Sequence, residues 1–167
     1  MTGLDAFVGE REIASAADME VFGRELGARL GAGDLVVLTG PLGAGKTTLT
    51  RGIAQGLNVR GRVQSPTFVI ARTHPSLDDG PPLVHVDAYR LGADAEFDDL
   101  DIDFAGSVVV AEWAAPFADA VADGWWEVEI ERGWSGTGVD NACGTAGRFT
   151  ADMEDAAPRK VTITRRG

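Results

Sequence analysis

A glycine-rich loop between an apolar run and a helical pattern sets the strongest limit on the possible folds of this chain. Residues 35–40, LVVLTG, are mostly apolar and β-favouring, which indicates a buried central strand. The loop that follows, GPLGAGKT at residues 40–47, satisfies the pattern G-x-x-x-x-G-K-[ST] at every position. Residues 46–57, KTTLTRGIAQGL, then predict a helix. The order of strand, loop and helix is the context that this pattern requires, so we expect a phosphate-binding loop (P-loop).

The residue types of the predicted P-loop suit a nucleoside triphosphate. Glycines let backbone N–H groups converge on phosphate oxygens without obstruction by a Cβ atom. Lys46 can reach the β- and γ-phosphates, and the Thr47 hydroxyl can be a ligand of Mg²⁺. The helix that begins there adds the positive end of its dipole. We therefore expect the nucleotide to contact Leu42, Gly43, Ala44, Gly45, Lys46, Thr47 and Thr48.

Two acidic residues that close apolar strands are candidates for the metal and for the attacking water. Glu112 ends the run VVVAE, where P-loop NTPases place the acid near Mg²⁺. Asp87 ends the alternating segment VHVD and could hold the metal, bind a metal-bound water or orient the attacking water. The alternatives are a surface glutamate at a strand end and a structural salt bridge between Asp87 and Arg90.

One tryptophan and two histidines have less specific surroundings. Trp113 follows Glu112, and two interpretations stay open: packing in the core, or a position beside the nucleotide. His74 and His85 lack the spacing of metal ligands, so we expect them to be surface and strand residues.

Alternating strand and helix patterns predict a single α/β domain over residues 1–167, with a mixed, mostly parallel sheet flanked by helices. Further strands or extended segments are expected within residues 6–13, 63–74, 82–91, 107–113, 125–132 and 159–166, and helices within 15–30, 92–106 and 114–122. The first helix carries a cap signal at Ser15 and an apolar face of Met19, Phe22, Leu26 and Leu30. Residues 133–158 show little periodicity, which favours a flexible insertion that joins two edge strands.

Composition limits the partners of this chain. The formal net charge is −11, with 26 acidic residues against 15 lysines and arginines, so we expect nucleic acid to be reached through a protein partner. Apolar runs are too short to span a bilayer, so no membrane contact is expected. The single cysteine, Cys143, excludes an internal disulfide, and the first residues lack the pattern of a secretory signal. A cytoplasmic location is therefore expected.

The sequence also bears on which nucleotide is bound and to what purpose. Lys160 does not lie in the N-K-x-D motif by which switch GTPases recognise guanine, so ATP is favoured. A small-molecule kinase stays open as an alternative, although the arginine-rich lid that it needs is represented only by Arg60 and Arg62. A binding module whose association is gated by ATP or ADP is a further alternative.

Four segments in order resemble the bacterial TsaE (formerly YjeE) ATPases: LTGPLGAGKTTLTRGIAQGL, VQSPTFVI, VHVDAYRL and VVVAEW. The resemblance covers about residues 10–130. It implies a P-loop NTPase fold and an ATPase subunit that serves synthesis of threonylcarbamoyladenosine at position 37 of tRNAs. It also implies binding to a TsaB–TsaD heterodimer, with tRNA reached only indirectly through that complex.

The resemblance further implies roles for individual residues. Ser65 and Thr67 match a segment that acts like a switch near the γ-phosphate, with Thr67 among the catalytic residues. Asp87 matches the acid required for activity, and Glu112 the acid at the metal. The remaining implied contacts with ATP or ADP and Mg²⁺ come from Lys46, Thr47, Trp113 and, near the adenine, Ser15. The family ends in a short hairpin, so residues 133–158 depart from it and no role is carried over there.

Overall fold

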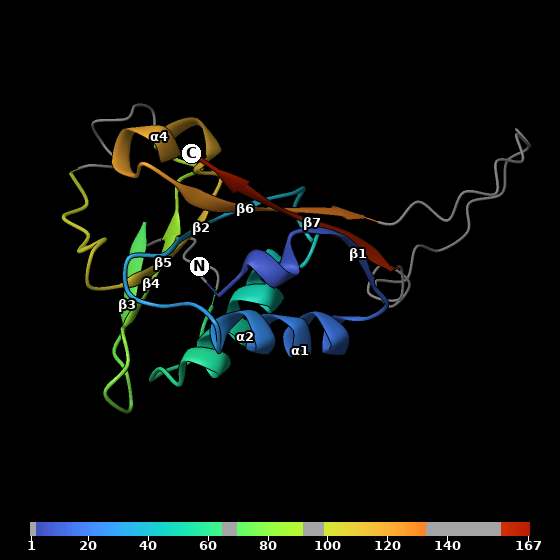
Figure 1. Ribbon diagram of the computed structural model, residues 1–167, viewed down its shortest axis with the longest axis horizontal. Coiled ribbons are helices and arrows are strands. Elements are labelled where there is room, and N and C mark those ends of the chain that lie inside the picture. Colours follow the sequence, from blue (N-terminus) through green and yellow to red (C-terminus); the bar gives the residue numbers. More distant parts are fainter. Residues whose placement is uncertain (1–2, 65–69, 92–98, 133–157) are drawn as a thin grey trace, which may run out of the picture.

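The computed structural model describes residues 3–64, 70–91, 99–132 and 158–167, and these form a seven-stranded sheet with helices on both faces (Figure 1). The strands lie in the order β1-β7-β6-β2-β5-β4-β3. Their bounds are Gly9–Ile13 (β1), Leu35–Thr39 (β2), Ala71–His74 (β3), Leu83–Asp87 (β4), Val108–Glu112 (β5), Trp125–Arg132 (β6) and Arg159–Arg166 (β7). The helices among the described residues are α1 (Ala16–Gly27), α2 (Lys46–Leu57) and α4 (Ala118–Val121), with 3-10 turns η1 (Asp5–Phe7) and η2 (Ala115–Phe117).

The centre of the sheet is parallel. Strand β2 pairs in parallel with β5 and β6, and β5 pairs in parallel with β4. Strands β3 and β7 are antiparallel to their neighbours, and β1, antiparallel to β7, runs in the direction of the central strands. Burial over almost the whole length of β2 and β5 explains why both are continuous apolar runs. The predicted α/β fold with a mixed, mostly parallel sheet is confirmed.

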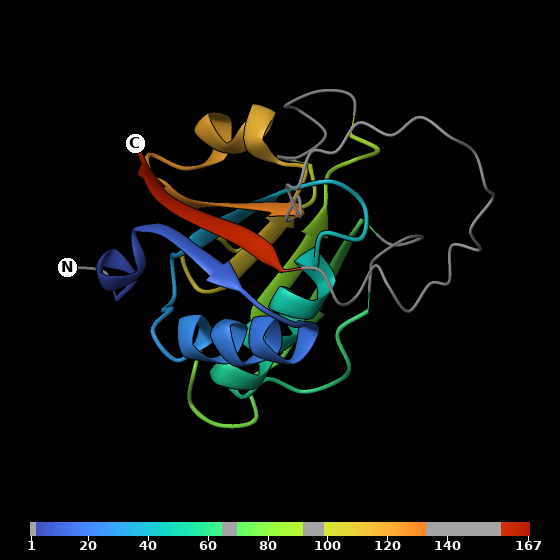
Figure 2. The same cartoon turned by 90° about the vertical axis from the view of Figure 1, so that its right-hand side faces the viewer.

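Helices α1 and α2 lie side by side against one face of the sheet (Figure 2). Helix α1 begins at the predicted cap, where Ser15 Oγ accepts a hydrogen bond of 3.1 Å from the backbone N–H of Asp18. The predicted apolar face of α1 is buried in the same cluster as Leu49 and Ile53 of α2. The two helices approach so closely that a Cβ atom added at Gly52 would overlap with the carbonyl oxygen of Glu20. Glycine at this contact therefore sets the distance between the helices.

We expect Gly52→Ala to lower the free energy of unfolding by about 1–3 kcal/mol, because the added methyl group must push α1 away from α2. Helix propensity alone predicts the opposite sign, since alanine is about 1 kcal/mol more favourable than glycine inside a helix. Urea denaturation followed by circular dichroism measures the difference. Gly31→Ala is the matched control, because a Cβ atom there meets open space. Equal stability of the two variants would contradict close packing of the helices.

The opposite face of the sheet is covered by shorter elements. A second apolar cluster lies on this face and includes Val37 of β2, Val86 of β4 and Val109 of β5. Ala114, which precedes η2, and Ala118, the first residue of α4, belong to the same cluster. The predicted helix within residues 114–122 is thus present as a 3-10 turn followed by one short helix. Among the described residues, the helical elements on this face are shorter than α1 and α2 (Figure 1).

One sequence prediction about element placement is wrong. Strands β6 and β7 were expected at the edge of the sheet, but β6 lies between β2 and β7, and β7 lies between β6 and β1. The N-terminal strand β1 returns to pair with β7 and takes the edge position instead. The helix predicted within residues 92–106 stays a prediction, because residues 92–98 lie outside the described residues. The described residues 99–106 form turns and irregular structure. The predicted insertion lies outside the described residues except for Pro158.

No helix in the described ranges is both long enough and apolar enough to cross a bilayer.

Candidate functional site

The predicted P-loop connects β2 to α2 at the carboxyl edge of the parallel strands. Gly43 and Gly45 have positive φ angles of 73° and 110°, which few other residues adopt without strain. The loop borders a cavity of about 260 Å³. The cavity is lined by Ser15, Ala16, Met19, Leu42, Gly43, Ala44, Gly45, Lys46, Thr47, Thr48, Asp87, Glu112, Trp113 and Arg159. Every predicted site residue that the structure describes is in this set, whereas Ser65 and Thr67 lie outside the described residues.

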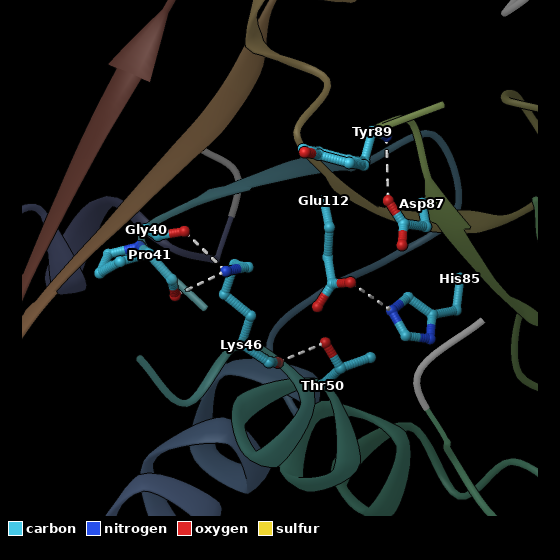
Figure 3. A network of polar contacts seen from close by, with 8 residues as sticks. All are labelled: Gly40, Pro41, Lys46, Thr50, His85, Asp87, Tyr89 and Glu112. Atoms are coloured by element: carbon cyan, nitrogen blue, oxygen red, sulfur yellow. Dashed lines mark hydrogen bonds and ion pairs between the residues drawn. The ribbon is translucent and has the colours of Figure 1, made fainter. Parts of the chain in front are cut away.

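Lys46 is buried and points back over the loop (Figure 3). Its Nζ donates hydrogen bonds of 2.6 and 3.0 Å to the carbonyl oxygens of Gly40 and Pro41. The same ammonium lies 4.6 Å from the centre of the Trp113 ring, within the range of a cation–π contact. Burial lowers the pKa of Lys46, while the nearby carboxylates of Glu112 and Asp87 act in the opposite direction. A positive charge held in a confined cavity suits a phosphate group.

The two predicted acids are brought together because β4 and β5 pair in parallel, with Asp87 opposite Glu112 in the register. Glu112 is only 3% exposed, and its Oε1 has no hydrogen-bond partner among the described residues. Asp87 is half-buried, and its Oδ1 accepts a hydrogen bond of 3.0 Å from the backbone N–H of Tyr89 (Figure 3). The ion pairs between described residues do not include one from Asp87 to Arg90, so the structural alternative for Asp87 is not supported.

The donor set of the cavity fits Mg²⁺. Mg²⁺ takes oxygen ligands, usually one or two carboxylates together with waters and substrate phosphates. Asp87 and Glu112 supply carboxylates, and the half-buried Thr47 at the start of α2 lines the same cavity. The buried Glu112 oxygen without a described partner needs a cation or a donor, since an unpaired buried carboxylate oxygen is costly. These residues could therefore hold the metal of a bound nucleotide.

Trp113 lies in the wall of the cavity rather than in the apolar core. The residue has a positive φ angle of 61°, which is unusual for a bulky side chain and turns the chain immediately after β5. Its ring makes an edge contact with Tyr89, with 5.5 Å between the ring centres. This position favours a place beside the nucleotide over packing in the core, because Trp113 is half-buried and lines the candidate site.

Ser15 lies at the end of the cavity formed by the start of α1. Its Oγ accepts from the backbone N–H of Asp18 and donates to Asp18 Oδ2 over 2.7 Å, so the hydroxyl is engaged in capping the helix. Ala16 and Met19, from the same helix, add apolar surface there. Apolar surface beside a phosphate-binding loop suits the flat face of a nucleotide base.

Besides the apolar Ala16 and Met19, two polar residues of the site region were not predicted from the sequence as site residues. His85 is fully buried in β4, and its Nε2 lies 3.8 Å from Glu112 Oε2 (Figure 3). The period of two along β4 was an available signal, because it places His85 on the same side as Asp87. Arg159, the first residue of β7, lines the cavity and donates from Nε to the Ala44 carbonyl oxygen over 3.2 Å. No local pattern pointed to it.

The expectation that the histidines are surface and strand residues is wrong for His74. This side chain is 4% exposed, and its Nδ1 lies 3.0 Å from the carbonyl oxygen of Arg60. The loop after α2 folds back over β3, which covers the ring. Burial lowers the pKa of His74, and the hydrogen bond to Arg60 partly offsets this effect. The neutral ring is therefore favoured at this position.

Comparison with known proteins identifies a family that this chain matches. The family model described as "Threonylcarbamoyl adenosine biosynthesis protein TsaE" matches residues 13–137. The tRNA threonylcarbamoyladenosine biosynthesis protein TsaE of Streptomyces coelicolor is 57% identical over 117 residues, covering 68% of this chain and 79% of that protein. The protein of the same name from Mycobacterium bovis is 45% identical over 133 residues, covering 74% and 79%. The family match includes the P-loop, both acids and Trp113, and it ends before Arg159.

A solved structure agrees with the fold. The crystal structure of Bacillus subtilis YdiB superimposes with a TM-score of 0.63 at 25% sequence identity, covering 95% of this chain and 85% of that chain. The TsaE protein of the same species is 40% identical over 102 residues, covering 60% of this chain and 63% of that protein.

Proposed function

This chain belongs to the TsaE family, and from that membership we propose that it is the ATPase subunit of the machinery that forms N6-threonylcarbamoyladenosine at position 37 of tRNA. Hydrolysis of ATP would support turnover of a TsaB–TsaD complex. The observation that carries the proposal is the convergence of Lys46, Asp87 and Glu112 on one cavity beside the P-loop. A phosphate-binding cation, an acid at the metal and an acid that orients the attacking water are the groups that phosphoryl transfer to water requires.

The proposed roles follow from the chemistry of each group. Backbone N–H groups of the P-loop and the Lys46 ammonium bind the β- and γ-phosphates. The Thr47 hydroxyl and the Glu112 carboxylate would hold Mg²⁺, which would supply positive charge to neutralise the phosphate oxygens. Asp87 orients a water molecule whose oxygen attacks the γ-phosphorus. The bond from that phosphorus to the bridging oxygen breaks, so the products are ADP and inorganic phosphate. Thr67, from the family resemblance, is assigned to the γ-phosphate side.

The proposal also names partners and a location. A chain with a formal net charge of −11 is poorly suited to bind tRNA directly, which supports contact with tRNA through TsaB–TsaD. We place the protein in the cytoplasm, where the tRNA and the TsaB–TsaD complex would be found. ATP is preferred over GTP because the N-K-x-D motif is missing from the sequence.

A reconstituted modification reaction tests the proposal. The purified chain is mixed with its cognate TsaB and TsaD, tRNA, ATP and a threonylcarbamoyl donor, and modified tRNA is counted per TsaD. We expect repeated turnover and free inorganic phosphate only when both the chain and ATP are present, because hydrolysis would reset the complex. Samples without the chain, or with a non-hydrolysable ATP analogue, are the controls. Equal turnover in all samples would refute the proposal, and phosphate found on an organic acceptor would instead identify a kinase.

A further inference from the structure

Two arginine side chains from the β6–β7 hairpin reach the P-loop. Arg132 is the last residue of β6 and Arg159 the first of β7, and they face each other in the register of the two strands. Arg132 Nη2 donates to the Leu42 carbonyl oxygen over 2.5 Å. Arg159 donates from Nη2 to the Gly43 carbonyl oxygen over 3.3 Å and from Nε to the Ala44 carbonyl oxygen over 3.2 Å. Three consecutive P-loop carbonyls thus accept from guanidinium groups. We call Arg132 and Arg159 the arginine clamp.

Gly43 shows that the P-loop is built to admit this contact. The general pattern G-x-x-x-x-G-K-T leaves the residue at position 43 free, so the motif does not explain a glycine there. In the structure its φ angle is 73°, and a Cβ atom would overlap with the Arg132 guanidinium group. Any larger residue at position 43 would displace Arg132 from the loop.

Contact with these carbonyls controls the direction of the neighbouring N–H groups. In a planar trans peptide the C=O of one residue and the N–H of the next point in opposite directions. Holding the carbonyls of Leu42 and Ala44 therefore also holds the N–H groups of Gly43 and Gly45, which belong to the same peptide units. The N–H of Ala44 donates to the Pro41 carbonyl oxygen over 3.1 Å within the loop. The clamp thus acts on the N–H groups by which a P-loop binds phosphate.

The clamp also places positive charge at this end of the molecule. The chain has a formal net charge of −11, which disfavours the approach of a polyphosphate. At the cavity, however, Lys46 and Arg159 lie in the same lining as Asp87 and Glu112, and Arg132 of β6 contacts the adjacent P-loop at Leu42. Guanidinium and ammonium groups thus lie next to the P-loop within a chain of negative net charge.

We propose that Arg132 and Arg159 are positioning residues that preorganise the P-loop for the polyphosphate of ATP and ADP. This inference rests on the proposed nucleotide site and adds two residues to it, of which Arg159 lies beyond the part of the chain that matches the family model. Preorganisation raises affinity because the ordering of the loop does not have to be achieved on binding. Hydrogen bonds from charged donors are strong enough that loss of either arginine is expected to weaken ADP binding about tenfold.

Calorimetric titration with Mg²⁺ and ADP tests the clamp in the full-length chain. We expect Arg132→Gln and Arg159→Met each to raise the dissociation constant for ADP about tenfold, with circular dichroism unchanged. Arg159→Lys should recover part of the affinity, since an ammonium can reach a carbonyl but lacks the fork that bonds two at once. Arg166→Gln is the matched control, because Arg166 is an exposed residue of the same strand that pairs with Glu127. Its affinity for ADP should equal that of the wild-type chain.

A double-mutant cycle separates the clamp from general disturbance of the loop. Gly43→Ala strains the backbone and displaces Arg132, whereas in an Arg132→Gln background only the strain remains. We expect the loss of ADP affinity from Gly43→Ala to be smaller in that background. Arg132 is exposed, so its variant keeps the test valid if Arg159→Met fails to fold. Wild-type affinity in Arg132→Gln and Arg159→Lys, or strictly additive effects in the cycle, would overturn the clamp. Wild-type chain that binds no ADP would instead refute the nucleotide site.

Discussion

Glu112→Gln is expected to lower the rate of ATP hydrolysis by about 100-fold or more while ADP binding is retained. The carboxylate lies at the end of β5, only 3% exposed and directly beside Asp87 in the sheet register. Glutamine preserves the shape of the side chain and removes the charge that Mg²⁺ requires. Because Glu112 Oε1 has no hydrogen-bond partner among the described residues, loss of this buried charge should not lower the stability of the fold. In this variant we therefore expect the rate of ATP hydrolysis to fall while the stability of the fold is kept.

Release of inorganic phosphate, measured with and without TsaB–TsaD, gives the effect on hydrolysis, and calorimetry with ADP gives the effect on binding. Glu131→Gln is the matched control, because it makes the same change at an exposed glutamate of β6. Asp87→Ala should show the same loss of hydrolysis if Asp87 orients the water. Normal rates in both Glu112→Gln and Asp87→Ala would reject a catalytic site at this cavity. Normal modification of tRNA despite lost hydrolysis would identify a nucleotide-gated binding module.

Lys46→Met is expected to weaken binding of ATP by about 100-fold or more. The ammonium is the cation of the P-loop, and its present partners are the carbonyl oxygens of Gly40 and Pro41 and the ring of Trp113. Methionine fills the space beside the ring but cannot donate to phosphate. Since burial already lowers the pKa of Lys46, removal of the charge also removes a desolvation cost. We therefore expect the fold to remain stable while affinity is lost.

Equilibrium titration with a fluorescent ATP analogue measures this loss. Lys160→Met serves as the control, because Lys160 is the other lysine of the chain and lies exposed on β7 between Glu10 and Glu131. The control should bind the analogue as the wild-type chain does. An unchanged affinity in Lys46→Met would mean that the P-loop does not hold the polyphosphate.

The local order of the chain was predictable because local patterns determine it. The strand at residues 35–39, the glycine turn and the helix from Lys46 are contiguous, and each has its own signal of apolar run, glycine or helical period. The placement of Glu112 and Asp87 at one edge of the sheet was also predictable, because parallel strands in an α/β sheet end on the same side. Ser15 was recognised from the capping pattern, and the structure places it at the cavity.

Other features depend on contacts between distant segments, and no local pattern carries them. Whether β6 and β7 are interior or edge strands is decided by β1, which is more than a hundred residues away in the sequence and pairs with β7. The burial of His74 depends on the loop near Arg60, which folds over it. Contact between α1 and α2 at Gly52 depends on how the two helix faces pack together. The sequence of one helix does not indicate which residues of the other helix it will meet.

Local signals were enough to predict the P-loop, the central strands and the acids at their ends, because strand period, turn chemistry and helix period act over a few neighbouring residues. The contacts of Arg132 and Arg159 with the P-loop, and of His85 with Glu112, are visible only in the folded chain. Those positions follow from strand order and register. Both are set by burial of the whole sheet between its two helical layers, a property of the complete fold.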